Sequence, residues 1–227
     1  MSDSAKMIDH IVYETGEEPT WSVIWLHGLG ADGHDFAPVA RELGFRDSPA
    51  VRFLFPHAPV RPITINAGMR MRGWYDIRGM AFDREEDRDG LEESRDHVHR
   101  LIARENARGI PAGRIFLAGF SQGGAVALFT GLRYPERLAG LVALSTYLPA
   151  ADSTLAERSG ANALVSVFMA HGTDDPVIPL ALAEHSRGLL GQMGYPVEWH
   201  TYTMPHSVHP EEILHIRTFM QDVVLAG

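Results

Sequence analysis

Short runs of consecutive apolar residues recur along the chain and predict buried strands. The runs cover residues 22–28, 51–56, 114–120, 138–146 and 162–172. Runs that are rich in Val, Ile, Leu and Phe at successive positions are typical of strands covered on both faces, as in parallel sheets. Residues 197–204 alternate between apolar and polar positions, which indicates a more exposed strand, and residues 10–15 are expected to add an edge strand.

Segments with the apolar spacing of helices alternate with these strands. They cover residues 33–44, 91–106, 121–138 (interrupted by Pro135), 180–194 and 209–227. This alternation over 227 residues predicts one α/β domain with a mostly parallel central sheet and helices on both faces. In such sheets ligands bind beyond the carboxyl ends of the strands, so polar residues that follow a strand become candidates for function.

The stretch from residue 57 to residue 90 interrupts the alternation. It is longer than most connections in compact domains, and it carries Trp74, Tyr75 and several other apolar residues. We therefore expect it to pack against the domain and to form a wall or cover over a site. The acidic run at 83–93 is expected only to begin the next helix, where carboxylates oppose the positive end of the helix dipole.

Composition excludes several classes of function. The formal net charge of −9 argues against binding to nucleic acid or to an acidic membrane surface. Because the chain has no cysteine, disulfides, thiolate metal ligands and cysteine nucleophiles are excluded. The first ten residues lack the regions of a signal peptide, and no run approaches the roughly 18 apolar residues of a membrane span. We therefore expect a cytoplasmic protein without stable membrane insertion.

Ser121 lies between a predicted strand and a predicted helix, in the sequence GFSQG at residues 119–123. This is the G-x-S-x-G pattern of a nucleophile elbow, a sharp turn that exposes the serine hydroxyl above the sheet. Gly119 and Gly123 fit because both positions approach neighbouring backbone closely. The pattern is short, and its alternative is a glycine-rich structural turn. The strand before it and the helix after it favour a nucleophile.

A serine nucleophile needs a base and an orienting acid, which in this fold follow it in the order Ser, Asp or Glu, His. The sequence HGTDDPVIP follows the predicted strand at 162–172. Its two adjacent acids, Asp174 and Asp175, compete for the role of the acid. We favour Asp175, because Pro176 restricts its backbone to extended or turn geometry.

The sequence PHSVHP follows the predicted strand at 197–204 and supplies the base. His206 lies closest to the strand end, whereas His209 is expected to begin the last helix, so we favour His206. A metal site of His206, His209 and His215 is disfavoured, because no carboxylate–histidine pattern with known ligand spacing supports it. With a histidine as base, activity is expected to rise with pH around its reference pKa of roughly 6.5–7.

Two backbone N–H groups are expected to form an oxyanion hole. One belongs to Gln122, the residue after the nucleophile, and the other to Leu29 in the glycine-rich sequence HGLGADG at 27–33. The alternative for that loop is a plain strand-to-helix turn. The mechanism requires no metal or organic cofactor, and its substrate is expected to be a small-molecule ester.

Six motifs together resemble the phospholipase/carboxylesterase family, which includes small bacterial carboxylesterases, acyl-protein thioesterases and lysophospholipases. In chain order they are WLHGLGADG, RPITINAGMRMRGWYDI, IFLAGFSQGGAVAL, LVALSTYLP, HGTDDPVIP and MPHSVHPEEI, from about residue 20 to the end. The resemblance implies an α/β-hydrolase that cleaves carboxylic esters of short to medium acyl chain through an acyl-enzyme. Some members cleave thioesters instead, and lysophospholipase activity is a further alternative.

The resemblance also implies roles for individual residues. It places the nucleophile at Ser121, the acid at Asp175 and the base at His206, with oxyanion donors at Leu29 and Gln122. Trp74 and Tyr147 would border the acyl groove. An exposed apolar rim around such a groove could support a homodimer.

The rival hypotheses are a peptidase on the same fold, a ligand-binding receptor that kept a hydrolase pocket, and a structural subunit.

Overall fold

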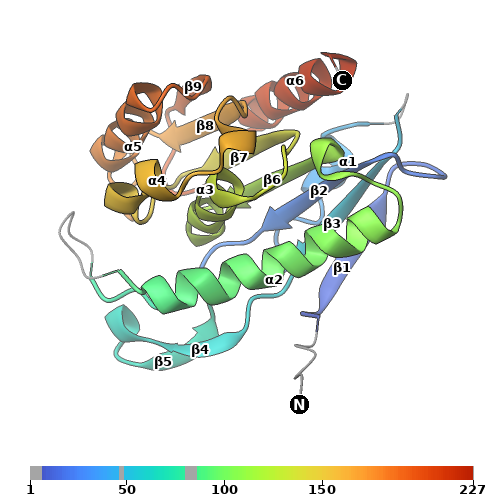
Figure 1. The fold of residues 1–227 in the computed structure, drawn as a ribbon. Coiled ribbons are helices and arrows are strands. Elements are labelled where there is room, and N and C mark those ends of the chain that lie inside the picture. Colours follow the sequence, from blue (N-terminus) through green and yellow to red (C-terminus); the bar gives the residue numbers. More distant parts are fainter. Residues whose placement is uncertain (1–6, 46–48, 80–85, 227) are drawn as a thin grey trace.

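A seven-stranded sheet forms the centre of the computed structural model, which describes residues 7–45, 49–79 and 86–226 (Figure 1). The strand order is β1-β3-β2-β6-β7-β8-β9. The strands are β1 (His10–Glu14), β2 (Trp21–Leu26), β3 (Val51–Pro56), β6 (Ile115–Phe120), β7 (Gly140–Leu144), β8 (Val167–Gly172) and β9 (Val197–Tyr202). Strand β1 is antiparallel to β3, and all the other neighbours pair in parallel, which confirms the predicted mostly parallel sheet.

Helices cover both faces of this sheet, as predicted (Figure 1). The helices are α1 (Val39–Glu42), α2 (Arg88–Ala107), α3 (Gln122–Arg133), α4 (Ala151–Glu157), α5 (Leu180–Gln192) and α6 (Pro210–Ala226). Short 3₁₀ turns are η1 (Thr64–Asn66), η2 (Ala112–Arg114) and η3 (Gly160–Asn162). None of the helices within the described ranges is both long and apolar enough to cross a membrane.

Two separate hydrophobic clusters lie on the two faces of the sheet. The first packs β-strand residues against α2, α3 and α5, and the second packs them against α1 and α6. In strand β2, Ile24 and Leu26 belong to the first cluster, whereas Val23 and Trp25 belong to the second. Successive strand side chains point to opposite faces, so a strand covered on both faces buries every position.

Two helices are shorter than the sequence predicts, and a proline explains each difference. The helix expected at 33–44 is only α1, which begins directly after Pro38; proline disfavours helical backbone in the residue before it. The helix expected at 121–138 ends at Arg133, because Tyr134, which precedes Pro135, is extended with φ −65° and ψ 134°. Helix α4 was not among the predicted elements.

The long stretch at 57–90 contains a hairpin of β4 (Val60–Ile63) and β5 (Met69–Arg72), which pair antiparallel. Its Trp74 and Tyr75 are buried, at 0% and 4% exposure, so the segment packs against the domain as expected. Residues 80–85, which include the start of the acidic run at 83–93, lie outside the described residues. Asp87, from that run, is the N-cap of α2, at the positive end of the helix dipole, and its Oδ1 accepts a hydrogen bond from Gly90 N.

Candidate active site

Ser121 occupies the single residue between the end of β6 and the start of α3, and its backbone is strained. Its φ is 56° and its ψ is −120°, a conformation that costs a non-glycine residue about 1–3 kcal/mol. Neighbouring groups hold this geometry: Ser121 N donates to Leu144 O at 2.8 Å, and Ser121 O accepts from Thr146 Oγ1 at 2.7 Å. The turn therefore has the shape that the G-x-S-x-G pattern predicts.

The two glycines of the pattern are required by close backbone contacts. A Cβ on Gly119 would lie 2.3 Å from the carbonyl atoms of Gly123. A Cβ on Gly123 would lie 2.2 Å from Leu26 O. Both distances are well below any tolerated contact, so no side chain fits at either position without moving β2, β6 or α3.

The structure brings His206 and Asp175 together from the loops that follow β9 and β8. His206 Nδ1 lies 2.7 Å from Asp175 Oδ2. The other carboxylate oxygen, Oδ1, accepts hydrogen bonds from Val177 N at 2.8 Å and Ile178 N at 2.9 Å. Those two bonds fix the carboxylate, so Oδ2 is aimed at the imidazole. Of the two adjacent acids in the sequence, Asp175 is the one that makes this pair.

The His206 ring also packs against Phe120, with ring centroids 4.7 Å apart. Phe120 directly precedes Ser121, so this contact places the imidazole beside the elbow. Within the described part of the chain, Ser121 Oγ makes no hydrogen bond to His206. Such bonds are often long in free enzymes and tighten only when substrate is present.

The other two histidines that sequence reasoning weighed lie elsewhere. His209 precedes α6, as expected: its backbone N donates to Glu212 Oε2 at 3.0 Å, and its Nδ1 accepts from Glu211 N at 3.2 Å. His215 Nδ1 pairs with Tyr202 OH at 2.8 Å. Among the residues that the structure describes, no three His, Asp or Glu side chains are grouped so that they could hold a metal ion.

His171, which sequence reasoning did not single out, lies against Asp175. Its side chain and that of Asp175 are both fully buried, and its Nε2 lies 3.3 Å from Asp175 Oδ2 and 2.8 Å from Ile178 O. Burial lowers the pKa of His171, which favours the neutral ring. Its Nδ1 has no partner among the described residues, so the proton belongs on Nε2, which can then donate. The position of His171, four residues before Asp175 at the end of a strand, was the available signal.

The loop that carries Leu29 is held by the buried His27. His27 Nε2 accepts from Ala58 N at 3.0 Å, which requires the ring proton to be on Nδ1, where it is donated to Gly28 O at 2.7 Å. Burial lowers the pKa of His27 to about 4, so the ring is neutral near pH 7. This single tautomer ties the loop to the segment after β3. His27 was also missed at the level of sequence.

The backbone N–H groups of Leu29 and Gln122 are both free to bind a ligand. Neither donates a hydrogen bond within the described residues. Gln122 is the first residue of α3, where backbone N–H groups lack a partner inside the helix and the helix dipole favours negative charge. The Leu29 loop lies next to the elbow, because a Cβ on Gly28 would be 3.6 Å from Ser121 Cβ.

The Gln122 side chain has a second role that the sequence did not reveal. Its Oε1 accepts from Trp74 N at 2.8 Å, and its Nε2 donates to Tyr75 O at 2.6 Å. The Trp74 indole N–H in turn donates to His27 O at 2.9 Å. The start of α3, the segment after β5 and the Leu29 loop are therefore joined in one buried network.

The two residues expected to border an acyl groove have little exposed surface. Trp74 is fully buried, and Tyr147 is 6% exposed. Both belong to the first hydrophobic cluster, and Tyr147 OH lies 2.7 Å from Tyr75 OH. The Trp74 indole supports the Leu29 loop through its bond to His27 O. That Trp74 and Tyr147 contact the acyl chain stays a prediction.

The parallel sheet, the serine elbow after β6 and the polar loops after β8 and β9 define an α/β-hydrolase fold. A family model described as Phospholipase/Carboxylesterase matches residues 8–224, and the chain belongs to this family. The resemblance stated from the sequence motifs is thus confirmed.

Individual relatives cover almost the whole chain. Acyl-protein thioesterase 1 of Gibberella zeae is 38% identical over 227 residues, which cover 96% of this chain and 97% of that protein. Acyl-protein thioesterase 1 of Neurospora crassa is 43% identical over 212 residues, covering 89% and 86% of the two chains. Among solved structures, Arabidopsis thaliana SOBER1 has a TM-score of 0.85 at 28% identity, covering 90% of this chain and 99% of that one. Zea mays acyl-protein thioesterase 2 has a TM-score of 0.83 at 25% identity, covering 95% and 98%.

Proposed function

We propose that this protein is a serine hydrolase that removes acyl chains from thioesters, with S-acylated proteins as its substrate class. The observation that carries the proposal is the strained Ser121 elbow beside the hydrogen-bonded pair of His206 and Asp175. The choice of thioesters is supported by the two relatives named acyl-protein thioesterase 1, at 38% and 43% identity. It replaces the carboxylesterase activity that we favoured from the sequence.

Each residue of the site has a defined part in the first step. Ser121 Oγ attacks the thioester carbonyl carbon while His206 Nε2 takes the hydroxyl proton. His206 Nδ1–H donates to Asp175 Oδ2, and this bond orients the ring and stabilises the imidazolium that forms. The oxygen of the carbonyl gains negative charge and is bound by the N–H groups of Leu29 and Gln122. Loss of one such donor lowers kcat by about 10²–10³-fold in known cases.

The second half of the reaction returns the enzyme to its starting state. The carbon–sulfur bond breaks, and His206 gives its proton to the leaving thiolate. Water then attacks the acyl-Ser121 ester while His206 takes a proton from it. The carboxylic acid leaves, and Ser121 regains its proton from His206.

Oxygen esters are a second candidate class of substrate, because the family model is described as Phospholipase/Carboxylesterase. The same residues would act in the same order, with an alcohol in place of the thiol. A matched pair of substrates separates the two classes: an octanoyl thioester and the corresponding octanoyl oxygen ester, which differ only at the scissile sulfur or oxygen.

The test measures kcat/KM for this pair with the wild type and with Ser121→Ala. We expect the wild type to prefer the thioester, to release octanoate from an S-octanoyl peptide, and to form an octanoyl adduct on Ser121 that is visible by mass spectrometry. Ser121→Ala should lose both activities and the adduct. A preference for the oxygen ester would return the assignment to a carboxylesterase. Equal rates in the variant and the wild type would contradict the whole mechanism.

A further inference from the structure

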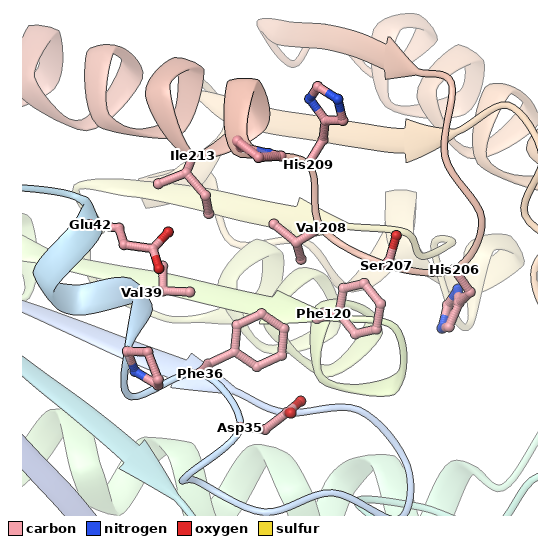
Figure 2. Close-up of a pocket in the computed structure, with 12 residues that line it drawn as sticks. Asp35, Phe36, Val39, Glu42, Phe120, His206, Ser207, Val208, His209 and Ile213 are labelled. Carbon is pink, nitrogen blue, oxygen red and sulfur yellow. The ribbon is translucent and has the colours of Figure 1, made fainter.

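A groove that the catalytic steps do not use begins at His206 and extends along α1. Its volume is about 440 Å³, within the range of pockets that bind small molecules. The lining comes from three parts of the chain: the segment around α1 (Asp35, Phe36, Pro38, Val39 and Glu42), Phe120 at the end of β6, and the segment that leads into α6 (residues 206–210 and Ile213). Figure 2 shows the rings of Phe36 and Phe120 in the middle of the groove, with His206 at one end and Glu42 at the other.

The aromatic floor of this groove is continuous with the elbow. Phe120, which directly precedes Ser121, packs against Phe36 with ring centroids 5.5 Å apart and against His206 at 4.7 Å. A substrate group that extends from the reacting carbon past His206 therefore enters the groove. That substrate group is the leaving group, because His206 must protonate it and it therefore departs on the His206 side.

The charged side chains that line the groove are acidic. Asp35 and Glu42 contribute carboxylates, and the lining includes no lysine or arginine. Neither carboxylate takes part in an ion pair among the described residues. The Arg217 guanidinium donates to the backbone oxygen of Glu42. Partial burial raises the pKa of Asp35, as does the neighbouring charge of Asp32.

Both features of the groove suit a positively charged ligand. Phe36 is buried and stacks against Trp25, whereas Phe120 is partly exposed, and a cation beside the Phe120 ring is attracted by its negative face. The carboxylates of Asp35 and Glu42 attract it further, and the net charge of −9 adds a weaker long-range attraction. An uncharged leaving group gains only the apolar contacts.

We propose that this groove binds the leaving group of the substrate and selects leaving groups that carry an ammonium or guanidinium. The inference rests on the proposed thioester hydrolysis. For an S-acylated protein, it assigns the groove to basic residues close to the acylated cysteine. Asp35 and Glu42 are thus specificity-determining residues and take no part in the chemical steps.

The test uses two thioesters that differ only in charge. Butanoylthiocholine carries a trimethylammonium group, and S-(3,3-dimethylbutyl) thiobutanoate replaces its nitrogen by carbon. The measured quantity is the ratio of kcat/KM for the cationic substrate to kcat/KM for the neutral one, at low ionic strength. We expect a ratio above 1 in the wild type, which falls roughly 2- to 5-fold in each of Asp35→Asn and Glu42→Gln, as removal of one partly exposed charge pair predicts.

Two controls make the outcome specific. Glu184→Gln removes an exposed carboxylate on α5, outside the groove, and should leave the ratio unchanged. Choline should inhibit the wild type more strongly than its neutral analogue 3,3-dimethylbutan-1-ol, and added salt should reduce that difference.

The two hypotheses fail in distinguishable ways. If the wild type hydrolyses neither thioester, or if Ser121→Ala hydrolyses both, the proposed function is wrong. If the wild type hydrolyses both but the ratio is the same in Asp35→Asn, Glu42→Gln and the wild type, the function stands and the cationic groove is wrong. Thermal unfolding of each variant verifies that the folded protein is being compared.

Discussion

His171 lies directly beneath Asp175, with its Nε2 3.3 Å from the same carboxylate oxygen that pairs with His206. Two backbone N–H groups hold the other carboxylate oxygen, Oδ1, and His206 hydrogen-bonds Oδ2. The Nε2–H of the neutral His171 donates to Ile178 O at 2.8 Å, and Ile178 N in turn donates to Asp175 Oδ1, so His171 supports the turn that holds the carboxylate. We infer that it positions the carboxylate for His206.

Replacement of His171 should separate positioning from packing. His171→Phe keeps the ring volume and removes the donor to Ile178 O, and we expect kcat to fall roughly 2- to 10-fold, as loss of a neutral hydrogen bond worth about 0.5–1.5 kcal/mol predicts. KM should change little. His171→Gln places an amide N–H near the position of Nε2 and should restore most of kcat. Steady-state kinetics on the octanoyl thioester decide this. Equal kcat in both variants and the wild type would remove His171 from the mechanism.

Gln122 should be needed for its side chain as well as for its backbone N–H. Gln122→Met has similar length but removes the acceptor of Trp74 N and the donor to Tyr75 O, both in the interior. Each buried group without a partner costs about 1–3 kcal/mol, so the free energy of unfolding in urea should fall by that order. We also expect a lower kcat, since Trp74 no longer supports the Leu29 loop. A variant with unchanged stability and kcat would show that the network is dispensable.

Gly119→Ala should prevent the elbow from forming. Its Cβ would lie 2.3 Å from Gly123, and neither strand nor helix can move without loss of the surrounding core. We expect a loss of more than about 3 kcal/mol, seen as a large decrease in Tm or as failure to fold. Gly188→Ala is the matched control, because Gly188 is an exposed residue of α5 with no atom within 4 Å of the Cβ position. That variant should gain up to about 1 kcal/mol. Similar Tm values for the two variants would contradict the model of the elbow.

Glu212 should make stability depend on pH. It is fully buried, and burial raises its pKa from 4.5 to about 7, although a hydrogen bond from His209 N acts in the opposite direction. The folded state therefore retains the proton more strongly than the unfolded state, and this contribution to stability is lost as pH rises from 4.5 through 7. Relative to Glu212→Gln, the wild type should lose up to about 3 kcal/mol over that interval.

Urea unfolding of the wild type and Glu212→Gln between pH 4.5 and 8.5 measures this effect. The observable is the change with pH in the difference between their free energies of unfolding, which removes any constant effect of the substitution. Glu211→Gln, at the exposed neighbouring position on α6, is the matched control. If the difference stays constant across the interval, folding does not raise the pKa of Glu212, and the prediction is wrong.

The sequence predicts the central sheet well because its strands are buried on both faces and are therefore apolar at successive positions. It also places Ser121, Asp175 and His206, since each follows a strand and the order along the chain is that of the fold. The choice of Asp175 over Asp174 agrees with the hydrogen bond between Asp175 and His206. The catalytic roles of Ser121, Asp175 and His206 stay predictions, which the experiments above test.

What the sequence does not reveal depends on contacts between distant segments. The hairpin of β4 and β5 is partly exposed and lacks an apolar run, so no strand pattern is visible there. Helix α4 is short, with Thr154 as its buried residue, and gives no clear periodicity. His27, His171 and the Gln122 side chain acquire their roles from backbone groups that lie up to 48 residues away, a relationship that local patterns do not encode.

The two hydrophobic clusters on opposite faces of the sheet are built from different residues. Trp74 and Tyr147 belong to one cluster, whereas Phe36 and Ile213 of the groove belong to the other. Because no side chain belongs to both clusters, distant substitutions on the two faces are expected to change the free energy of unfolding additively. The fold can therefore change the packing on one face of the sheet while it keeps the packing on the other, which leaves it open to stepwise diversification.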